Sequence, residues 1–490
     1  MRYVLNHFYK LKHDKYRSLI YSSNANEVAV VVDKNWMDFV HRIYAMILSF
    51  FSRPITIKMA VKDIANFLST KESIVCSLID KMINSRGYFH IPYKGHDSNF
   101  PPNILIQEKE LKSEVVDYRP EMFLYKDVDL NTFRLFNSPL DITFMVNNKC
   151  LTNCIYCYAN KNYKCKSLDF SKVESIIDEA DNLGIRNFSV DGGEFFIYPY
   201  WKELLQVLKY HKFVPYLVST KYLISEDDIV YFSRFNIPLQ ISLDSYNSKV
   251  LDKMVGKIPL YAEKMVETLQ CLDKHYPFQI ATILTCYNGT IENMEDMLSH
   301  IRQYKNIKKW DIRVAFKSLY ALDDFTKIQL KREAIPAIRE WVNRKQQEVP
   351  FELTFSSGRE LDFYQTKGGS MNFKGNRCSA NSTHLFILPD GKVSICEQLY
   401  WNERFIIGDL MEQSISDVWK SSKALHLANM QAKDYSKESA CKSCLMLSSC
   451  NSALNKCFTN ILKVYGEEHW DFPDPRCYYA PRGISDAIYV

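Results

Sequence analysis

The sequence lacks the features that mark membrane, secreted and repetitive proteins. Its longest apolar stretch, roughly Ile43 to Phe51, is interrupted by Ser49 and is far shorter than the ~20 residues of a membrane span. The first residues mix charged and aromatic side chains and contain no apolar secretion signal. Internal repeats and low-complexity tracts are also missing. We therefore expect a globular, cytoplasmic protein that does not bind membranes.

A strong excess of charge of either sign is missing too. The 490 residues include 62 basic and 57 acidic side chains, and the net charge of +5 does not indicate binding to nucleic acid. Hydrophobic residues make up 47% of the chain, which is enough for a large core, and this length suits several domains. We expect three.

The middle of the chain alternates short β-rich segments with longer helical patterns. Strands are expected at DITFMVN, NFSVDGG, VPYLVST, LQISLDS, QIATILT and DIRVAF, and helices near 168–183, 199–211, 225–234, 259–275, 291–304 and 327–348. Such alternation is typical of βα units around a parallel sheet. It predicts an α/β fold with a partial (β/α)6 barrel at residues 139–348, whose chemistry lies on the loops after the strands.

The two ends of the chain have different patterns. Residues 26–40 indicate a strand or hairpin that leads into a helix, and two short helical patterns, a glycine turn and a strand follow Pro54. This order predicts a winged-helix-like domain at residues 1–110 and a linker at 111–138. A barrel-capping segment or a DNA-binding winged helix is the alternative, and the weak charge argues against the second. At residues 349–490, dense cysteines predict a domain stabilised by metal.

Ten of the fourteen cysteines fall in two groups, and without a secretion signal they are better explained as reduced ligands than as disulfides. The first group, Cys150-x3-Cys154-x2-Cys157, follows the first predicted strand. Three thiolates so close in sequence can converge on three corners of an iron–sulfur cubane. A zinc site or chance spacing is the alternative, but structural zinc usually has four ligands.

This trio, with Tyr156 beside its last cysteine, resembles the signature of radical S-adenosylmethionine (SAM) enzymes. The resemblance implies that Cys150, Cys154 and Cys157 hold a [4Fe-4S] cluster whose fourth iron is open to SAM. It also implies the family's reaction, in which the reduced cluster cleaves SAM to a 5′-deoxyadenosyl radical that takes hydrogen from carbon.

Other positions match the SAM site of this family. Asp191-Gly192-Gly193-Glu194 resembles its Gly-Gly-Glu motif, although a simple turn is the alternative. Ser219 and Thr220 stand where the family places polar groups near SAM, or they cap a helix. Ser242 and Asp244 resemble its ribose-binding motif. The implied SAM site is therefore Tyr156, Gly192, Gly193, Glu194, Ser219, Thr220, Ser242 and Asp244. The arginine that many relatives direct at the SAM carboxylate is missing, and Lys253 or Lys257 either replaces it or is a surface charge.

The second group of cysteines resembles the SPASM extension of radical SAM enzymes, which carries two auxiliary [4Fe-4S] clusters. The spacings Gly391-x4-Cys396 and Cys441-x2-Cys444-x5-Cys450 fit, whereas the six residues before Cys457 exceed the usual three. The resemblance implies a first auxiliary cluster on Cys378, Cys396 and Cys457 and a second on Cys441, Cys444, Cys450 and Cys477. No eighth thiolate is evident, so the first cluster is expected to have an open iron. A pair of zinc knuckles is the alternative.

The N-terminal pattern resembles the recognition domain of enzymes that modify ribosomally synthesised peptides (RiPP maturases). We expect a maturase that installs a thioether or carbon–carbon cross-link in a precursor peptide, whose leader binds as a strand beside the wing. The expected electron donor is a flavodoxin or ferredoxin. The alternatives are an anaerobic sulfatase-maturating enzyme, a peptide epimerase and an inactive peptide-binding scaffold. An epimerase needs a thiol to return hydrogen, and Cys286 is the candidate, unless it is a small core residue.

Overall fold

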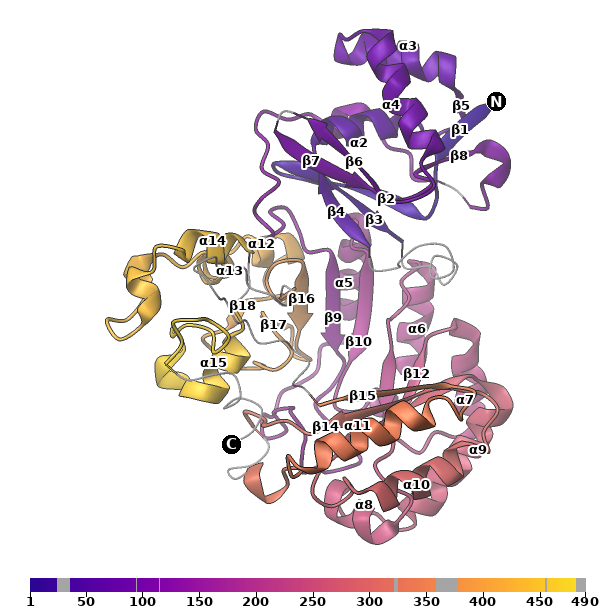
Figure 1. Cartoon of the computed structure of the whole chain (residues 1–490), viewed down its shortest axis with the longest axis vertical. Helices are drawn as coiled ribbons and strands as arrows, with labels where there is room; N and C mark the ends of the chain where they lie inside the picture. Colours follow the sequence, from indigo (N-terminus) through magenta and orange to yellow (C-terminus); the bar gives the residue numbers. More distant parts are fainter. Residues whose placement is uncertain are drawn as a thin grey trace. The chain divides into compact units, whose positions relative to one another are not determined.

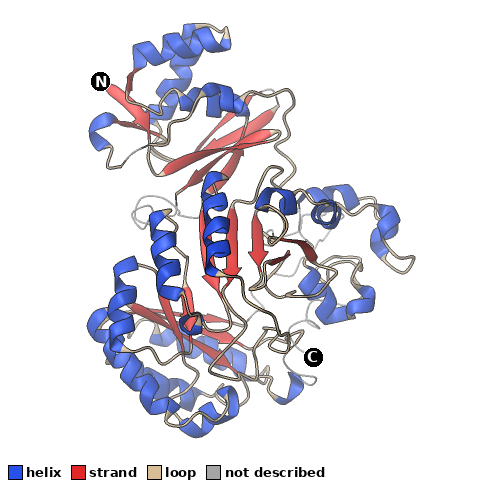
Figure 2. Ribbon diagram, turned by 180° about the vertical axis from the view of Figure 1, so that it is seen from behind, coloured by secondary structure: helices blue, strands red, loops and turns tan. Residues whose placement is uncertain are grey.

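The computed structural model describes residues 1–23, 36–93, 95–113, 115–320, 325–357, 378–453 and 456–481. The chain divides into two compact units, Met1–Ser138 and Pro139–Val490. Both units combine helices with sheets (Figures 1 and 2). No helix among these residues has both the length and the apolar character that crossing a membrane requires.

The described residues of the N-terminal unit form two small antiparallel sheets, three α-helices and a hairpin. The first sheet has β1 (Arg2–Leu5) between β5 (Ile55–Thr56) and β8 (Leu105–Gln107), and the second is β2 (Tyr9–Asp14), β3 (Arg17–Ser22) and β4 (Met37–Val40). Helices α2 (Arg42–Ser49), α3 (Ile57–Leu68) and α4 (Glu72–Asn84) precede the hairpin of β6 (Phe89–Tyr93) and β7 (His96–Phe100). Helices followed by a hairpin are the order of a winged helix. Residues 24–35, part of the expected strand or hairpin, lie outside the described residues.

Residues 111–138, which the sequence suggests are a linker, are packed into this unit. The Tyr118 hydroxyl accepts a hydrogen bond from the Leu11 amide (3.0 Å), and Phe123 and Leu135 are fully buried. Arg17 and Asp14 hold the end of the segment. The Arg17 guanidinium donates to backbone carbonyls of residues 132 and 134, and Asp14 Oδ1 accepts from the amides of residues 136 and 137. The segment is therefore a structural part of the unit.

The second unit contains the six parallel strands that the sequence predicts. They are β9 (Asp141–Met145) and β10 (Asn187–Asp191) in one sheet, and β11 (Val218–Thr220), β12 (Leu239–Ser242), β13 (Phe278–Leu284) and β14 (Ile307–Val314) in another. The connecting helices are α5 (Phe170–Asn182), α6 (Trp201–Tyr210), α7 (Glu226–Phe232), α8 (Ser248–Val255), α9 (Tyr261–His275), α10 (Ile291–Ile301) and α11 (Ala334–Lys345). The predicted α/β class with parallel strands is confirmed, and α8 is an addition to the prediction.

The C-terminal part of the chain joins the same sheets. Strand β15 (Glu352–Ser356) pairs in parallel with β14, and β16 (His384–Ile387) pairs in parallel with β9, with His384 opposite Asp141. Strands β17 (Lys392–Ser394) and β18 (Ile406–Asp409) extend the β9 sheet further (Figure 1). Helices α12 (Ile415–Trp419), α13 (Ser422–Ala428), α14 (Leu447–Ala453) and α15 (Phe458–Tyr465) complete this part. The cysteine-rich region is therefore built directly onto the first strand of the parallel fold.

The buried ion pair of the N-terminal unit generates a stability prediction. Arg17 Nε lies 3.3 Å from Asp14 Oδ2, and both side chains are almost completely buried. Arg17→Met leaves the Asp14 carboxylate buried without its cation, so we expect a loss of about 3–5 kcal/mol in unfolding free energy. Hydrogen exchange of peptides from residues 1–138 measures this loss. The control is Arg53→Met, which removes an exposed pair with Asp117 (2.8 Å) and should cost less than about 1 kcal/mol. Equal effects of the two variants would contradict the account.

Candidate active site

The first cysteine group lies on the loop after β9. The amides of Asn153 and Ile155 donate to the carbonyls of Val255 and Met254 at the end of α8 (2.8 and 2.9 Å), which fixes the loop between two elements. Cys150 is exposed to solvent, whereas Cys154 and Cys157 are partly buried. The loop thus presents one exposed and two partly buried thiols.

The three thiols lie close enough for their charges to interact. Burial, together with the charges of Cys157, Glu194 and Cys154, raises the pKa of Cys150 to about 12. A thiol must lose its proton to bind iron, and bound cations reverse such a shift. In the part of the chain that the structure describes, no three Cys, His, Asp or Glu side chains surround the position of a single metal ion. A cubane is larger than an ion, because each thiolate binds a different iron.

The Gly192–Gly193 pair is required where β10 passes the cysteine loop. A Cβ atom on Gly193 would lie 2.3 Å from the carbonyl oxygen of Lys149, which no side chain tolerates. The Gly193 amide donates to the carbonyl of Asn147 (2.8 Å) and fastens the two loops together. The glycines therefore allow a close backbone approach, and a simple turn does not explain them.

Glu194 is buried and held from two sides. Its carboxylate accepts hydrogen bonds from the Thr220 hydroxyl (2.5 Å) and the Lys221 amide (3.1 Å). Burial raises the pKa of Glu194, and these bonds oppose the rise. The alternative role of Thr220 as a helix cap is wrong, because the following helix α7 is capped by Ser225, which accepts from the Asp228 amide (3.3 Å). Thr220 instead orients Glu194.

Asp244 forms the centre of a second polar cluster. Its Oδ2 atom contacts the Tyr156 hydroxyl (2.5 Å) and the Lys221 ammonium (2.8 Å), and its Oδ1 atom accepts from the Ile283 amide (2.9 Å). Burial and the charge of Asp244 raise the pKa of Tyr156 well above its ordinary value. The cluster thus joins the cysteine loop to β11, β12 and β13.

Lys221 is a residue that the sequence analysis missed. Its ammonium also donates to the carbonyl of Ser242 (3.0 Å), so it spans the two residues of the predicted ribose motif. Lys253, one of the two lysines considered for the SAM carboxylate, lies over the ring of Tyr287 (5.3 Å), and Lys257 lines a surface hollow. The available signal for Lys221 was its position directly after Ser219 and Thr220. Ser219 itself contacts the hydroxyl of Ser242 (3.3 Å).

Acidic and phenolic side chains lie between the two cysteine regions. The charge of Asp191 is the largest cause that raises the pKa of Tyr158, and Glu397, Cys157 and Cys396 contribute as well. Burial and the charge of Asp191 raise the pKa of Glu397 to about 7. Tyr158 therefore lies near both the cysteine loop after β9 and the loop after β17. The sequence analysis missed these side chains, and their only signal was that Tyr158 and Glu397 adjoin cysteines.

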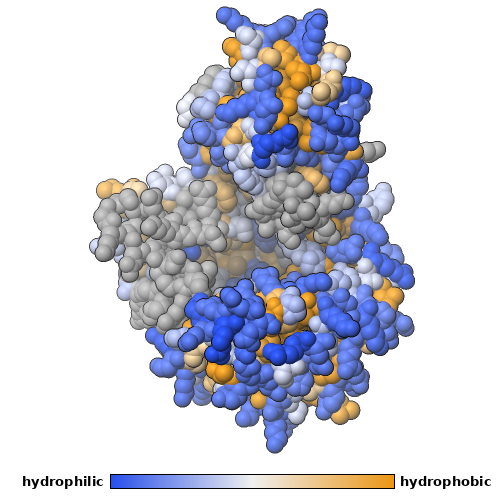
Figure 3. All heavy atoms as spheres, turned by 45° about the vertical axis from the view of Figure 1, so that its right-hand side comes forward, coloured by the Kyte–Doolittle hydropathy of each residue, from blue (hydrophilic) through white to orange (hydrophobic). Residues whose placement is uncertain are grey.

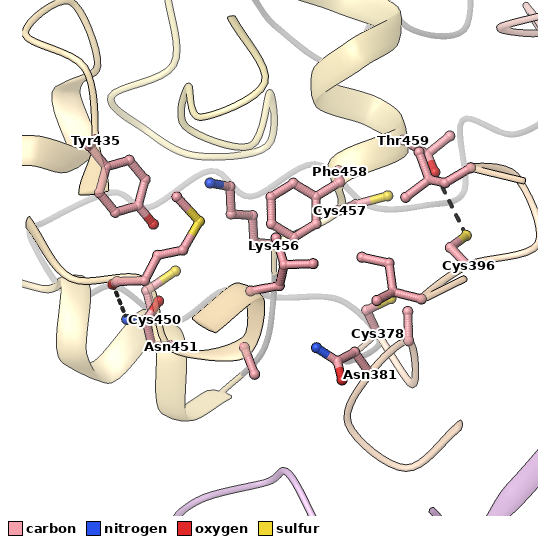
Figure 4. A pocket seen from close by; sticks show the side chains of 16 residues that line it. Cys378, Asn381, Cys396, Tyr435, Cys450, Asn451, Lys456, Cys457, Phe458 and Thr459 are labelled. Carbon is pink, nitrogen blue, oxygen red and sulfur yellow. Dashed lines mark hydrogen bonds between the residues drawn. The ribbon is translucent and has the colours of Figure 1, made fainter. Parts of the chain in front are cut away.

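The seven C-terminal cysteines separate into two groups by their mutual charges. Figure 4 shows Cys378, Cys396 and Cys457 on one side and Cys450 on the other. Burial raises the pKa of Cys396 to about 12, and the charges of Cys457 and Cys378 contribute to that rise. Burial also raises the pKa of Cys450 to about 12, and the charges of Cys441 and Cys477 contribute to that rise. The charge of Cys444 in turn acts on Cys477. The two groups are therefore Cys378, Cys396 and Cys457 on one side, and Cys441, Cys444, Cys450 and Cys477 on the other. They are the same sets that the resemblance to SPASM domains implies.

Two buried lysines accompany these groups. Burial lowers the pKa of Lys463 to about 8, against the charges of Cys457 and Cys396, and its ammonium donates to Gln398 Oε1 (3.1 Å). Burial also lowers the pKa of Lys456, against the charges of Cys441 and Cys450. Cations beside grouped thiols suit a site that is anionic when its ligands are deprotonated.

Cys286, the candidate hydrogen donor, is exposed on the loop after β13. Its thiol donates to the backbone carbonyl of Lys327 (3.4 Å). The alternative that Cys286 is a small core residue is therefore wrong.

Comparisons with known proteins agree with this arrangement. Residues 145–303 match the radical SAM superfamily, and residues 378–445 match SPASM, an iron–sulfur cluster-binding domain. The antilisterial bacteriocin subtilosin biosynthesis protein AlbA of Bacillus subtilis (strain 168) is 24% identical over 309 residues. This match spans 61% of the present chain and 64% of AlbA, less than two thirds of that relative.

Solved structures of SuiB from Streptococcus suis have the same fold. The crystal structure bound to the precursor peptide SuiA is 15% identical, with a TM-score of 0.64, and covers 98% of this chain and 100% of that chain. The crystal structure bound to S-adenosylmethionine is 16% identical, with a TM-score of 0.60, and covers 97% and 100%. The likeness extends over the N-terminal unit as well as the parallel fold.

The polar cluster around Asp244 generates a prediction for SAM binding. Lys221→Met should weaken binding of SAM at least ~10-fold, because a charge-assisted bond to a buried carboxylate contributes about 1.5–3 kcal/mol. Equilibrium dialysis of the anaerobically reconstituted chain against labelled SAM measures this change. Lys257→Met is the matched control and should bind SAM like the unaltered chain. If Lys257→Met instead weakened SAM binding more than Lys221→Met, Lys257 would be the lysine of the SAM site.

The cysteine loop after β9 and the close glycine approach lie in the region that matches radical SAM, and four of the seven C-terminal thiols, Cys378, Cys396, Cys441 and Cys444, lie in the region that matches SPASM. A radical SAM domain binds SAM and a [4Fe-4S] cluster, and a SPASM domain binds auxiliary iron–sulfur clusters. This chain therefore contains a radical SAM domain at residues 145–303 and a SPASM domain at residues 378–445.

Proposed function

We propose that this enzyme is a peptide maturase that installs a thioether or carbon–carbon cross-link between side chains of a ribosomally synthesised precursor. The observation that carries the proposal is the likeness over 98% of the chain to SuiB, which was crystallised with its precursor peptide. The biosynthetic role named for AlbA supports the same class of substrate. The winged-helix-like N-terminal unit provides a separate surface for recognising a peptide.

The ligands of the three proposed clusters follow the three groups of interacting thiols. Cys150, Cys154 and Cys157 would hold the SAM cluster, Cys378, Cys396 and Cys457 the first auxiliary cluster, and Cys441, Cys444, Cys450 and Cys477 the second. When bound, this set supplies a carbon-centred radical from SAM and acceptors for the electron that an oxidative cross-link releases.

The remaining residues of the site bind and orient SAM. Gly193 keeps the cysteine loop and the loop after β10 in contact, and Thr220 fixes the direction of the Glu194 carboxylate toward the SAM amino group. Tyr156 and Lys221 hold Asp244, which is the carboxylate proposed to bind the ribose hydroxyls. Ser219 and Ser242 line the same edge. Tyr158, Asp191 and Glu397, which lie between two of the cysteine groups, are proposed to contact the substrate.

The N-terminal unit is proposed to bind the leader of the precursor. Among the described strands, β6 pairs with β7 alone, so its other edge is open to an added strand, although Pro92 removes one donor there. Met59 on α3 and Ile74 on α4 are more than half exposed, and Figure 3 shows apolar surface among the hydrophilic side chains of this unit. An extended peptide with apolar side chains fits both features.

The product identifies the reaction. After anaerobic co-expression with the small open reading frame beside its gene, mass spectrometry should show a precursor lighter by two hydrogens. Cys150→Ala should abolish SAM cleavage, whereas Cys457→Ala should retain some cleavage but give no product, since the second variant loses only the first auxiliary cluster. Cys271→Ala, which alters a cysteine outside the three groups, is the control and should behave like the unaltered chain.

Three outcomes would contradict parts of this proposal. An unchanged peptide mass with inverted stereochemistry would indicate an epimerase, and no modification of any kind would remove the maturase assignment. Normal product from Cys457→Ala would show that the first auxiliary cluster is assigned to the wrong thiols. A precursor without its leader should be modified poorly, and full modification of that peptide would exclude leader recognition.

A further inference from the structure

The C-terminal cysteine-rich region buries an ammonium that has no hydrogen-bond acceptor in the described part of the chain. Lys456 Nζ is inaccessible to solvent and bonds to none of the described side chains or carbonyls. It lies 4.8 Å from the ring centres of Tyr435 and of Phe458, between the two rings (Figure 4). Three donors on one cation are therefore left without acceptors in the protein interior.

Such a group is unfavourable unless a negative charge compensates it. The faces of Tyr435 and Phe458 attract the cation but accept no full hydrogen bond. The two carboxylates whose charges reach Lys456 are engaged elsewhere: Asp471 accepts from the Ser436 amide (2.6 Å), and Asp474 accepts from the Arg476 guanidinium (2.8 Å) and the Cys457 amide (2.7 Å). Neither carboxylate bonds to Lys456, and the charges of both act on it less strongly than those of Cys441 and Cys450.

Thiols are the remaining neighbours that become negative. The charges of Cys441 and Cys450 act on Lys456, and Lys456 acts in turn on both thiols. These are two of the four proposed ligands of the second auxiliary cluster. A cubane held by four thiolates carries net negative charge, and its sulfur atoms accept hydrogen bonds.

We propose that Lys456 is the buried counter-ion and hydrogen-bond donor of the auxiliary cluster on Cys441, Cys444, Cys450 and Cys477, and that it raises the reduction potential of that cluster. The inference rests on the cluster assignment made above. A nearby positive charge and hydrogen bonds to the sulfur atoms both stabilise the reduced, more negative form. Lys456 is a positioning residue here, because it acts on the substrate only through the cluster.

Lys463 offers a contrast within the same domain. It is also buried, but it faces Cys396 and Cys457 and has Gln398 as a hydrogen-bond acceptor. Of these two lysines, Lys456 is the one that acts on Cys441 and Cys450 and has no hydrogen-bond acceptor among the described residues. The expected effect is therefore specific to the second auxiliary cluster.

A redox titration followed by electron paramagnetic resonance tests this proposal. The full-length chain carries Cys150→Ala, Cys154→Ala and Cys157→Ala together, so that only the auxiliary clusters are reduced. Adding Lys456→Met should move one of the two midpoint potentials to more negative values. The expected shift is at least 59 mV, which for one electron is a tenfold change in the ratio of reduced to oxidised cluster at a fixed potential. Lys456→Arg should restore most of the shift, and Lys437→Met, which removes an exposed charge of the same domain, should cause none.

The outcomes separate this proposal from the cluster assignment. Two full auxiliary clusters with unchanged potentials in Lys456→Met would overturn the role of Lys456 alone. Absence of auxiliary clusters in the parent chain would overturn the assignment of the seven thiols. If Lys456→Met loses a cluster and Lys456→Arg retains it, the counter-ion role is supported. If both variants lose the cluster, the role is contradicted, because the cluster would then depend on the shape of the lysine side chain and not on its charge.

Discussion

The parallel pairing of β16 with β9 is the constraint on which the catalytic unit depends. Strand β9 leads into the loop of Cys150, Cys154 and Cys157, and β16 leads through β17 to Cys396. The two strands are neighbours in one sheet, and β17 turns back antiparallel to β16 before the chain reaches Cys396. The charges of Cys157 and Cys396 both act on Tyr158, so two cysteine groups that are far apart in the sequence lie on either side of a common acidic and phenolic region.

The need to compensate buried charges explains why carboxylates in the site lie beside hydrogen-bond donors and why grouped thiols lie beside lysines. Grouped thiols repel one another when they ionise, and buried carboxylates such as Glu194 and Asp244 are stable only when donors surround them. Thr220, Tyr156 and Lys221 supply those donors to the carboxylates. Beside the C-terminal thiols, Lys456 and Lys463 supply the positive charge. The protein therefore prepares charge and orientation, and the iron–sulfur clusters complete the balance.

Much of this arrangement could be predicted from the sequence, because it depends on local patterns. The alternation of strands and helices predicts the parallel fold, and the resemblance to radical SAM and SPASM motifs predicts the same groups of thiols that interact in the structure. Other features depend on contacts between distant segments. Lys221 resembles any surface lysine until Asp244 lies beside it, and residues 111–138 resemble a polar linker until Arg17 and Asp14 bind their backbone. The four-residue apolar strand β16 is too short to distinguish from a helix turn or a loop by periodicity.

The iron and acid-labile sulfide content of the anaerobically purified chain tests the central claim most directly, namely that its ten grouped thiols hold three clusters. The account predicts about 12 iron atoms and about 12 sulfides per chain, four of each for every cubane. It also predicts about eight of each after Cys150→Ala, Cys154→Ala and Cys157→Ala are combined. Zinc in place of iron, or only about four iron atoms in the unaltered and fully reconstituted chain, would contradict it.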